Sequence, residues 1–215
     1  RSSDLIMTDK KRCINAEDLY KFELISAPQI SPDGEQVVYA QQTVDPKTEK
    51  KYSHLWIAAA DGSGARQFTF GNQVDNLPKW SLDGSQIAFI SNREDEKQAQ
   101  IYLIPTKGGE GRSLTGLKGE FKTFEWSPDG SQIAIQFRKK DTEVVEREED
   151  EQKQKLGIVE RHYDRVFYKF DGYGFLPQER WHIWIVDVNS GLAKQISDDP
   201  VFDEEEPTWS PDGQW

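Results

Sequence analysis

Sulfur and histidine are scarce in this sequence. Its 215 residues include one cysteine, Cys13, one methionine, Met7, and three histidines. A single thiol excludes an internal disulfide framework, which indicates a reducing compartment and predicts a cytoplasmic protein. Cys13 follows a basic run that favours a thiolate, but neither a histidine nor a second cysteine lies near it in the sequence. We therefore interpret it as an ordinary terminal thiol.

Long apolar runs and an excess of positive charge are also missing. No segment approaches the ~20 apolar residues of a transmembrane helix, and no signal peptide is visible. Asp and Glu number 38 against 27 Lys and Arg, which gives a formal net charge of −11. A surface this acidic repels phosphate groups, so we expect neither nucleic-acid nor membrane binding. The 12% aromatic content, with seven tryptophans, indicates a folded soluble domain.

The usual signatures of catalytic and cofactor sites are absent as well. The sequence contains no Gly-x-Ser-x-Gly nucleophile elbow, no phosphate loop, no dinucleotide fingerprint and no Cys/His zinc pattern. We therefore predict no catalytic residue, no cofactor and no metal in this chain. Among the histidines only His162 is a candidate for chemistry, because His54 and His182 occupy matching positions of an internal repeat.

That repeat is a four-residue turn of the form Ser-Pro-Asp-Gly, with Leu in place of Pro in one copy. Its copies begin at Ser31, Ser81, Ser127 and Ser210, and a tryptophan precedes the last three, whereas Ile30 precedes the first. Proline presets one backbone angle of such a turn, aspartate bonds nearby N–H groups, and glycine supplies a positive φ. An alternating apolar run follows the first three copies, so each turn predicts a β-hairpin.

A second hairpin follows the first in each unit, which gives four short antiparallel strands, the pattern of a propeller blade. The first two intervals between turns match blades of about 40 to 50 residues, and the third is longer by roughly 35 residues. We predict an all-β fold, a partial β-propeller of three four-stranded antiparallel blades plus the first strand of a fourth, with a short N-terminal helix. Three blades cannot close a ring, so this domain is expected to be truncated and to associate through its open edges.

The expected boundaries follow from the repeat. We expect residues 1–13 to be a flexible N-terminus, with residues 1–6 a cloning remnant before Met7 as the native start, and residues 14–25 to form the helix. The propeller is predicted over residues 26–215, with blades at 26–70, 76–116 and 120–198, an insertion at 138–180, and a fourth blade starting at 206–215. Asn15 is the expected N-cap, because acidic residues follow it in the first turn. The helix either covers one propeller face or docks on another domain.

Two polar segments remain to be interpreted. Six acidic residues between 198 and 206 lack the spacing of a calcium loop, so we interpret them as a solvated loop between blades; alternatively, some face the central channel and hold a cationic ligand. The first half of the insertion is dense in charge and is expected to be exposed. Its second half mixes aromatic residues with arginine, and either forms a packed hairpin or contacts substrate. For substrate contact we select Arg161, His162, Tyr163 and Arg165.

Two flanking motifs resemble the acylaminoacyl-peptidase-like branch of the prolyl oligopeptidase family. They are the segment from Asn15 to Tyr20 leading into Ser26–Gly34, and the segment Tyr168–Phe175 before His182–Asp187. The resemblance implies a serine peptidase whose propeller admits short peptides to a C-terminal α/β-hydrolase domain. That domain would carry the Ser-Asp-His triad, so this chain alone is expected to be inactive, and the N-terminal helix would dock on it. TolB-type propellers share the repeat, so the alternative is a non-enzymatic protein-binding module.

Overall fold

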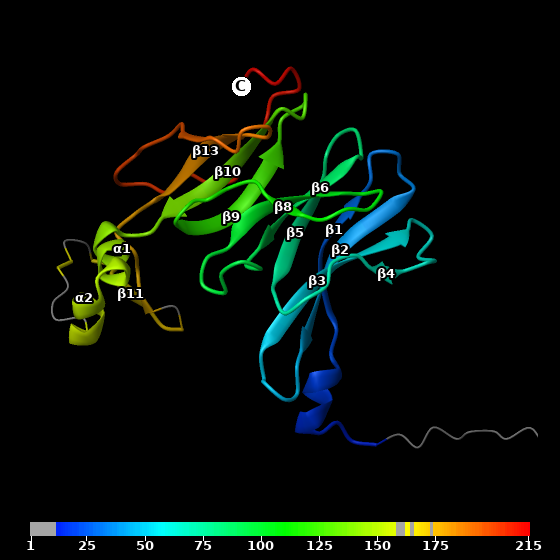
Figure 1. The fold of residues 1–215 in the computed structure, drawn as a ribbon, viewed down its shortest axis with the longest axis horizontal. Coiled ribbons are helices and arrows are strands. Elements are labelled where there is room, and N and C mark those ends of the chain that lie inside the picture. Colours follow the sequence, from blue (N-terminus) through cyan, green and yellow to red (C-terminus); the bar gives the residue numbers. More distant parts are fainter. Residues whose placement is uncertain (1–11, 158–161, 164–165, 173) are drawn as a thin grey trace, which may run out of the picture.

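The computed structural model describes residues 12–157, 162–163, 166–172 and 174–215 (Figure 1). It contains three four-stranded antiparallel sheets, each built from consecutive parts of the chain. Blade 1 consists of β1 (Leu24–Ile30), β2 (Gln36–Val44), β3 (Lys51–Ala59) and β4 (Arg66–Gln67), and blade 2 of β5 (Asp75–Trp80), β6 (Gln86–Ser91), β7 (Gln100–Pro105) and β8 (Arg112–Ser113). Blade 3 consists of β9 (Gly119–Trp126), β10 (Gln132–Lys139), β13 (Trp181–Asp187) and β14 (Ala193–Gln195). The partial propeller is confirmed.

The insertion leaves blade 3 after β10 and returns at β13, as the interval between the turns predicted. We call residues 140–180 the strap. It contains α1 (Thr142–Glu149), α2 (Glu151–Leu156) and a small hairpin of β11 (Lys169–Phe170) and β12 (Gly174–Phe175). Despite this insertion, β10 and β13 pair over seven consecutive residue pairs, from Gln132 with Asp187 to Arg138 with Trp181. The strap therefore projects from an intact sheet, away from blades 1 and 2 (Figure 1).

Two apolar layers hold the blades together. One layer joins side chains of blades 1 and 2, such as Leu55 and Phe89, and the other joins blades 2 and 3, such as Ile90 and Phe137. Successive residues of a strand point to opposite faces of a sheet. In β6, Ile87 and Phe89 therefore face blade 1, while Ala88 and Ile90 face blade 3. The middle blade is buried on both faces, which explains why its central strands carry apolar runs, such as Ile87–Ile90 between the polar ends of β6.

The repeated turn forms the same hydrogen bonds in all four copies. In each, the glycine N–H donates to the serine carbonyl at 2.9 Å, and the serine hydroxyl donates to the aspartate Oδ1 at 2.5 to 2.6 Å. The four glycines have φ between 67° and 77°, a left-handed conformation that favours glycine. The turn chemistry expected from the sequence is thus present, including in the copy with Leu82.

Each tryptophan before a turn fastens its blade to the preceding one. In each case the indole Nε1–H donates to a backbone carbonyl of the preceding blade. The acceptor residue comes one position before the residue that corresponds to the tryptophan in that blade. The three bonds are Trp80 to Gln29 at 3.1 Å, Trp126 to Lys79 at 3.3 Å and Trp209 to Glu125 at 3.2 Å. We call this recurring contact the indole clasp. It fixes the height of one blade relative to the next, which apolar packing alone does not specify.

The N-terminal helix prediction was correct in its start and wrong in its length. Asn15 is the N-cap, and its backbone N–H donates to Asp18 Oδ2 at 3.1 Å. The helix, however, is a single 3₁₀ segment, Ala16–Lys21, and Leu24 and Ile25 already pair with β2. Antiparallel pairing satisfies the backbone groups that a longer helix would have used. The proposed start at Met7 and residues 1–11 lie outside the described residues.

The fourth blade differs from its prediction in a similar way. Its turn at Ser210 and its indole clasp are present, but residues 203–209 form no β-ladder within the described part of the chain. A first strand pairs with the second strand of its own blade, as β5 pairs with β6, and no such partner strand is present among the described residues after the turn at Ser210. In the residues that the structure covers, no helix is long and apolar enough to cross a membrane.

Replacing Trp126 with Phe should lower the free energy of unfolding by about 1 kcal/mol or more, because an aromatic side chain remains, although smaller, while the clasp donor is lost. Urea denaturation followed by circular dichroism measures the change. Trp215→Phe is the matched control, since this ring is 86% exposed and its indole donates no hydrogen bond within the described residues. Equal stability of the two variants would show that the clasp contributes nothing.

The turn aspartates predict a defined pH dependence. Hydrogen bonds from the Ser127 hydroxyl and from the Ser131 backbone and side chain lower the pKa of Asp129 to about 2, against about 3.9 for an unfolded aspartate. A lowered folded pKa adds stability above the unfolded value, and this stability is lost as the pH falls through about 4 toward 2. A carboxyl NMR titration should give a midpoint near 2 for Asp129, and a midpoint near 3.9 would contradict the bonding described.

Candidate functional site

Hydrogen bonds join the first and the last part of the strap next to blade 3. Asp141 precedes α1, and its carboxylate accepts hydrogen bonds from the backbone N–H groups of Gln178 and Glu179, at 3.0 to 3.1 Å. Its side chain does not cap its own helix; it binds the returning segment. This single carboxylate therefore joins the outgoing and incoming chain and sets where the strap lies.

An aromatic cluster organises the second half of the strap. The rings of Tyr163, Tyr168 and Phe175 lie 5.0, 5.7 and 6.5 Å apart, measured between centroids. Lys169 places its Nζ 5.5 Å from the centre of the Phe175 ring. Ring pairs at these distances attract beyond the area that they bury. Within the described residues, this half of the strap is therefore held by contacts among its own side chains, and whether it contacts substrate stays a prediction.

A pocket of about 560 Å³ opens between the helical and the aromatic halves of the strap. Its volume lies within the range of ~300 to 1,000 Å³ that is typical of small-molecule sites. The lining comprises residues of α1, the described aromatic segment and the returning chain: Asp141, Thr142, Glu143, Val144, Arg147, Glu148, His162, Tyr163, Phe175, Leu176, Pro177, Gln178 and Glu179. We call this the strap pocket, and it is the candidate functional site.

Two of the four residues selected from the sequence line this pocket. His162 is exposed and Tyr163 is half-buried, and the carbonyl of His162 accepts a bond from Gln178 Nε2 at 3.4 Å. Arg161 and Arg165 lie outside the described residues. Substrate contact therefore remains a prediction for all four residues, and the structure places His162 and Tyr163 beside a cavity.

Sequence reasoning missed Arg147, which contributes the pocket's only arginine among its described lining residues. Its Nη1 is buried and has no hydrogen-bond partner within the described part of the chain. Arg147 lies in a charge-dense helix, where it was indistinguishable from solvated neighbours. The one available signal was helical spacing, because Val144, Arg147 and Glu148 recur on one face, and all three line the pocket.

His54 and His182 hold blade junctions, as their repeat positions predicted. The ring of His54 contacts the Gly71 carbonyl at 2.8 Å through Nε2, and the ring of His182 contacts Glu204 Oε2 at 2.9 Å through Nδ1. Hydrogen bonds from Ser197 and His182 lower the pKa of Glu204. Both histidines thus connect the third strand of a blade to the segment that leads into the next.

The acidic segment lies between blade 3 and the turn at Ser210, as expected for a loop between blades. Three of its six acids also contact blade 3, although Asp203 and Glu205 are exposed. Asp203 accepts from the Trp181 backbone N–H at 3.0 Å, Glu204 binds His182, and Glu205 pairs with Lys122 at 2.6 Å. These acids attach the start of the fourth blade to blade 3. Within the described residues, no group of three or more His, Cys, Asp or Glu side chains is arranged to hold a metal ion.

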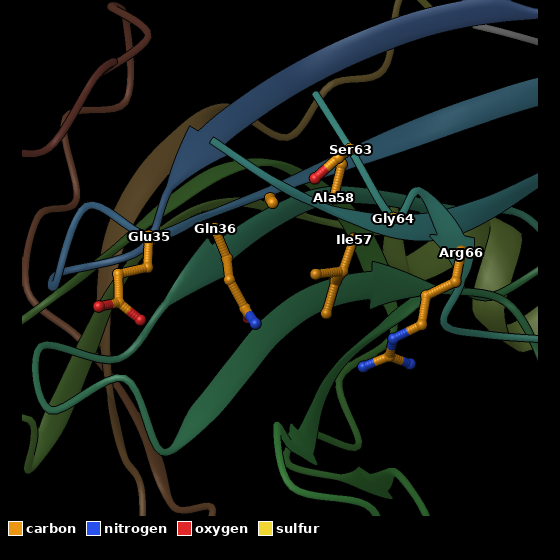
Figure 2. A pocket seen from close by; sticks show the side chains of 8 residues that line it. Glu35, Gln36, Ile57, Ala58, Ser63, Gly64 and Arg66 are labelled. Carbon is orange, nitrogen blue, oxygen red and sulfur yellow. The ribbon is translucent and has the colours of Figure 1, made fainter. Parts of the chain in front are cut away.

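A second pocket lies on blade 1 and offers less chemistry. It has a volume of about 320 Å³ and is lined by Glu35, Gln36, Ile57, Ala58, Ala59, Ser63, Gly64 and Arg66. Figure 2 shows Glu35 and Arg66 at its two ends, with Gln36 and Ile57 between them. In blade 2 the matching arginine, Arg112, donates to the Val188 carbonyl of the next blade at 2.9 Å. This pocket is therefore a feature of the repeated blade edge.

The sequence matches a family model described as a TolB beta propeller domain over residues 7–164. The chain is 32% identical over 205 residues to a protein of Bacillus subtilis named uncharacterized peptidase YuxL, which covers 95% of this chain and 31% of that protein. It is 39% identical over 74 residues to dipeptidyl-peptidase 5 of Porphyromonas gingivalis, covering 34% of this chain and 11% of that protein. The chain thus spans less than a third of the length of these relatives.

Solved structures with the same fold include a peptidase and a protein described as a putative TolB. A Pyrococcus horikoshii acylaminoacyl peptidase superposes with a TM-score of 0.62 at 20% identity, covering 82% of this chain and 25% of the peptidase. The putative TolB of Agrobacterium tumefaciens superposes with a TM-score of 0.55 at 22% identity, covering 90% of this chain and 52% of that structure. At these identities the likeness concerns the fold alone.

Replacing Asp141 with Ala should loosen the strap while leaving the blades folded, because two N–H groups lose their acceptor. Hydrogen exchange at Gln178 and Glu179 should become about tenfold faster, the equivalent of about 1.4 kcal/mol for bonds to a charged acceptor. Exchange measured by mass spectrometry tests this. Glu143→Ala is the control, since its exposed side chain makes no bond in the described part of the chain. Unchanged exchange in Asp141→Ala would show that this carboxylate does not hold the strap.

Proposed function

We propose, from the premise that this chain belongs to the TolB β-propeller domain family, that it is the propeller portion of a peptidase. The supporting observation is the match to a Bacillus subtilis peptidase over 95% of this chain, which accounts for only 31% of that protein. The remaining length of the relative has room for a separate catalytic domain. The flanking motifs, of which Tyr168–Phe175 lies within the strap, agree with the same assignment.

The proposed parent is a cytoplasmic serine peptidase of the prolyl oligopeptidase family, which cleaves short peptides or acylated or aminoacyl N-termini. Its serine would attack the scissile carbonyl while a histidine accepts the proton, and both would lie in an α/β-hydrolase domain outside this sequence. The propeller would limit access, because a ring of blades admits an extended peptide and excludes a folded protein. This chain alone is proposed to be inactive.

Two surfaces of the chain fit this proposal. Ile14, Leu19 and Phe22 around the N-terminal 3₁₀ segment are 79%, 58% and 49% exposed, so they offer apolar area for docking of the hydrolase domain. The strap pocket offers His162 and Tyr163, and we include Arg161 and Arg165, for contact with the peptide. Until a neighbouring blade covers them, the open blade edges are proposed to self-associate.

A second candidate is a TolB-like module that binds proteins without catalysis. The observation that favours it is the superposition with the Agrobacterium tumefaciens protein over 90% of this chain. The match to the Bacillus subtilis peptidase carries more weight, because it reaches 32% identity over 205 residues, whereas the superposition is at 22% identity and concerns the fold alone.

Peptide hydrolysis by the parent protein tests the proposal. The parent should release p-nitroaniline from acylated aminoacyl substrates, whereas the 215-residue chain should not. In the parent, Tyr163→Ala should raise KM by about tenfold with kcat retained, as expected when a contact present in both the ground and transition states is lost. Phe170→Ala is the control, because this exposed ring does not line the pocket. Hydrolysis of these substrates by the purified 215-residue chain alone would refute the proposal. A parent protein that does not hydrolyse them would also refute it.

A further inference from the structure

Arg147 carries a buried donor without an acceptor. Its Nη1 is shielded from solvent and makes no hydrogen bond in the described part of the chain, and the guanidinium enters no ion pair there. A buried donor that lacks a partner is unfavourable, and more so when it is charged. Because Arg147 lines the strap pocket, a ligand in that pocket can supply the missing acceptor.

The carboxylates around the pocket do not fulfil this role. Asp141 accepts from two backbone N–H groups, and both oxygens of Glu148 accept from Lys140 Nζ at 2.6 Å. Glu143 and Glu179 also line the pocket, yet neither forms an ion pair with Arg147 within the residues described. The guanidinium is therefore the one unneutralised cation of the pocket in this part of the chain, although acids surround it.

The rest of the wall indicates what kind of anion fits. Tyr163 and Phe175 stack at 5.7 Å and line the same pocket as Arg147. A guanidinium binds a carboxylate through two parallel N–H bonds, and the aromatic rings accommodate an apolar side chain beside it. We propose that Arg147 binds a carboxylate of a peptide held in the strap pocket. This inference rests on the proposed function, since it assumes that the pocket receives peptides.

Two pairs of peptides separate the possible sources of the carboxylate. Ac-Ala-Ala-Phe as free acid and as C-terminal amide tests the chain end. Ac-Ala-Asp-Ala-NH₂ and Ac-Ala-Asn-Ala-NH₂ test an acidic side chain. Binding of each peptide to the 215-residue chain is measured from the chemical-shift changes of backbone amide resonances in the strap. In at least one pair the acidic member should bind about tenfold more tightly, as expected for a charge-assisted bond.

Variants show whether Arg147 provides the preference. Arg147→Gln should abolish it, and Arg147→Lys should retain part of it, because a lysine keeps the charge and loses the two-pronged geometry. The matched control is Lys153→Gln on α2, an exposed cation that pairs with Glu146 at 3.1 Å and does not line the pocket. Circular dichroism confirms that all three variants remain folded.

The outcomes separate this inference from the proposed function. A preference for the acidic peptide that disappears only in Arg147→Gln supports the inference, and the pair that shows it identifies the source. Equal binding of acid and amide, or a preference that persists in Arg147→Gln, overturns the inference while leaving the pocket a peptide site. Absence of binding by all four peptides also overturns it. The proposed function is then judged separately, by hydrolysis in the parent and by the effect of Tyr163→Ala.

Discussion

The structure depends on the hydrogen bond from a tryptophan indole to a carbonyl of the preceding blade. Apolar layers between blades supply attraction, but they are compatible with several offsets of one sheet on the next. A directional bond at the same repeat position removes that freedom, and it recurs at Trp80, Trp126 and Trp209. Even the start of the fourth blade, which forms no ladder among the described residues, is held in place by this bond and by acids that bind blade 3.

The contacts between blades stop at the two outer faces of the group, one on blade 1 and one on blade 3. Blade 1 carries Ile30 at the tryptophan position, and Leu24, Ile25 and Ile30 are 57%, 64% and 66% exposed. In blade 3, Leu192 before β14 and Ile196 after it are 75% and 56% exposed. Both faces match surfaces that are covered in the middle blade, where the central strands are buried on both sides. A ring of blades would cover such faces, so the exposed area agrees with a partial propeller. The strap contacts the connection between blades 2 and 3 through Lys118, whose side chain pairs with Glu149 at 2.5 Å and whose carbonyl accepts from the Lys140 backbone N–H at 3.1 Å.

Much of the fold could be predicted from the sequence because the information is local and repeated. The turn needs particular residues at particular positions, and four copies reveal the period and the insertion. Long-range competition was harder to anticipate: Leu24 and Ile25 fit a helical spacing, yet pairing with β2 decides their conformation. The site was only partly predictable. Aromatic residues mixed with arginine singled out His162 and Tyr163, which line the strap pocket. The surroundings of Arg147, by contrast, depend on which of many charged neighbours pair with each other, and the folded strap sets that pairing.

Exchange of the indole Nε1–H protons tests the central claim most directly. In NMR spectra of this chain in deuterated solvent, the protons of Trp80, Trp126 and Trp209 should exchange more slowly than that of Trp215, whose ring is 86% exposed. Protection at all three positions is the expected result, because each proton is engaged with the carbonyl of a neighbouring blade. Exchange of all four protons at the same fast rate would contradict the account, since the blades would then be packed without the bond that sets their relative positions.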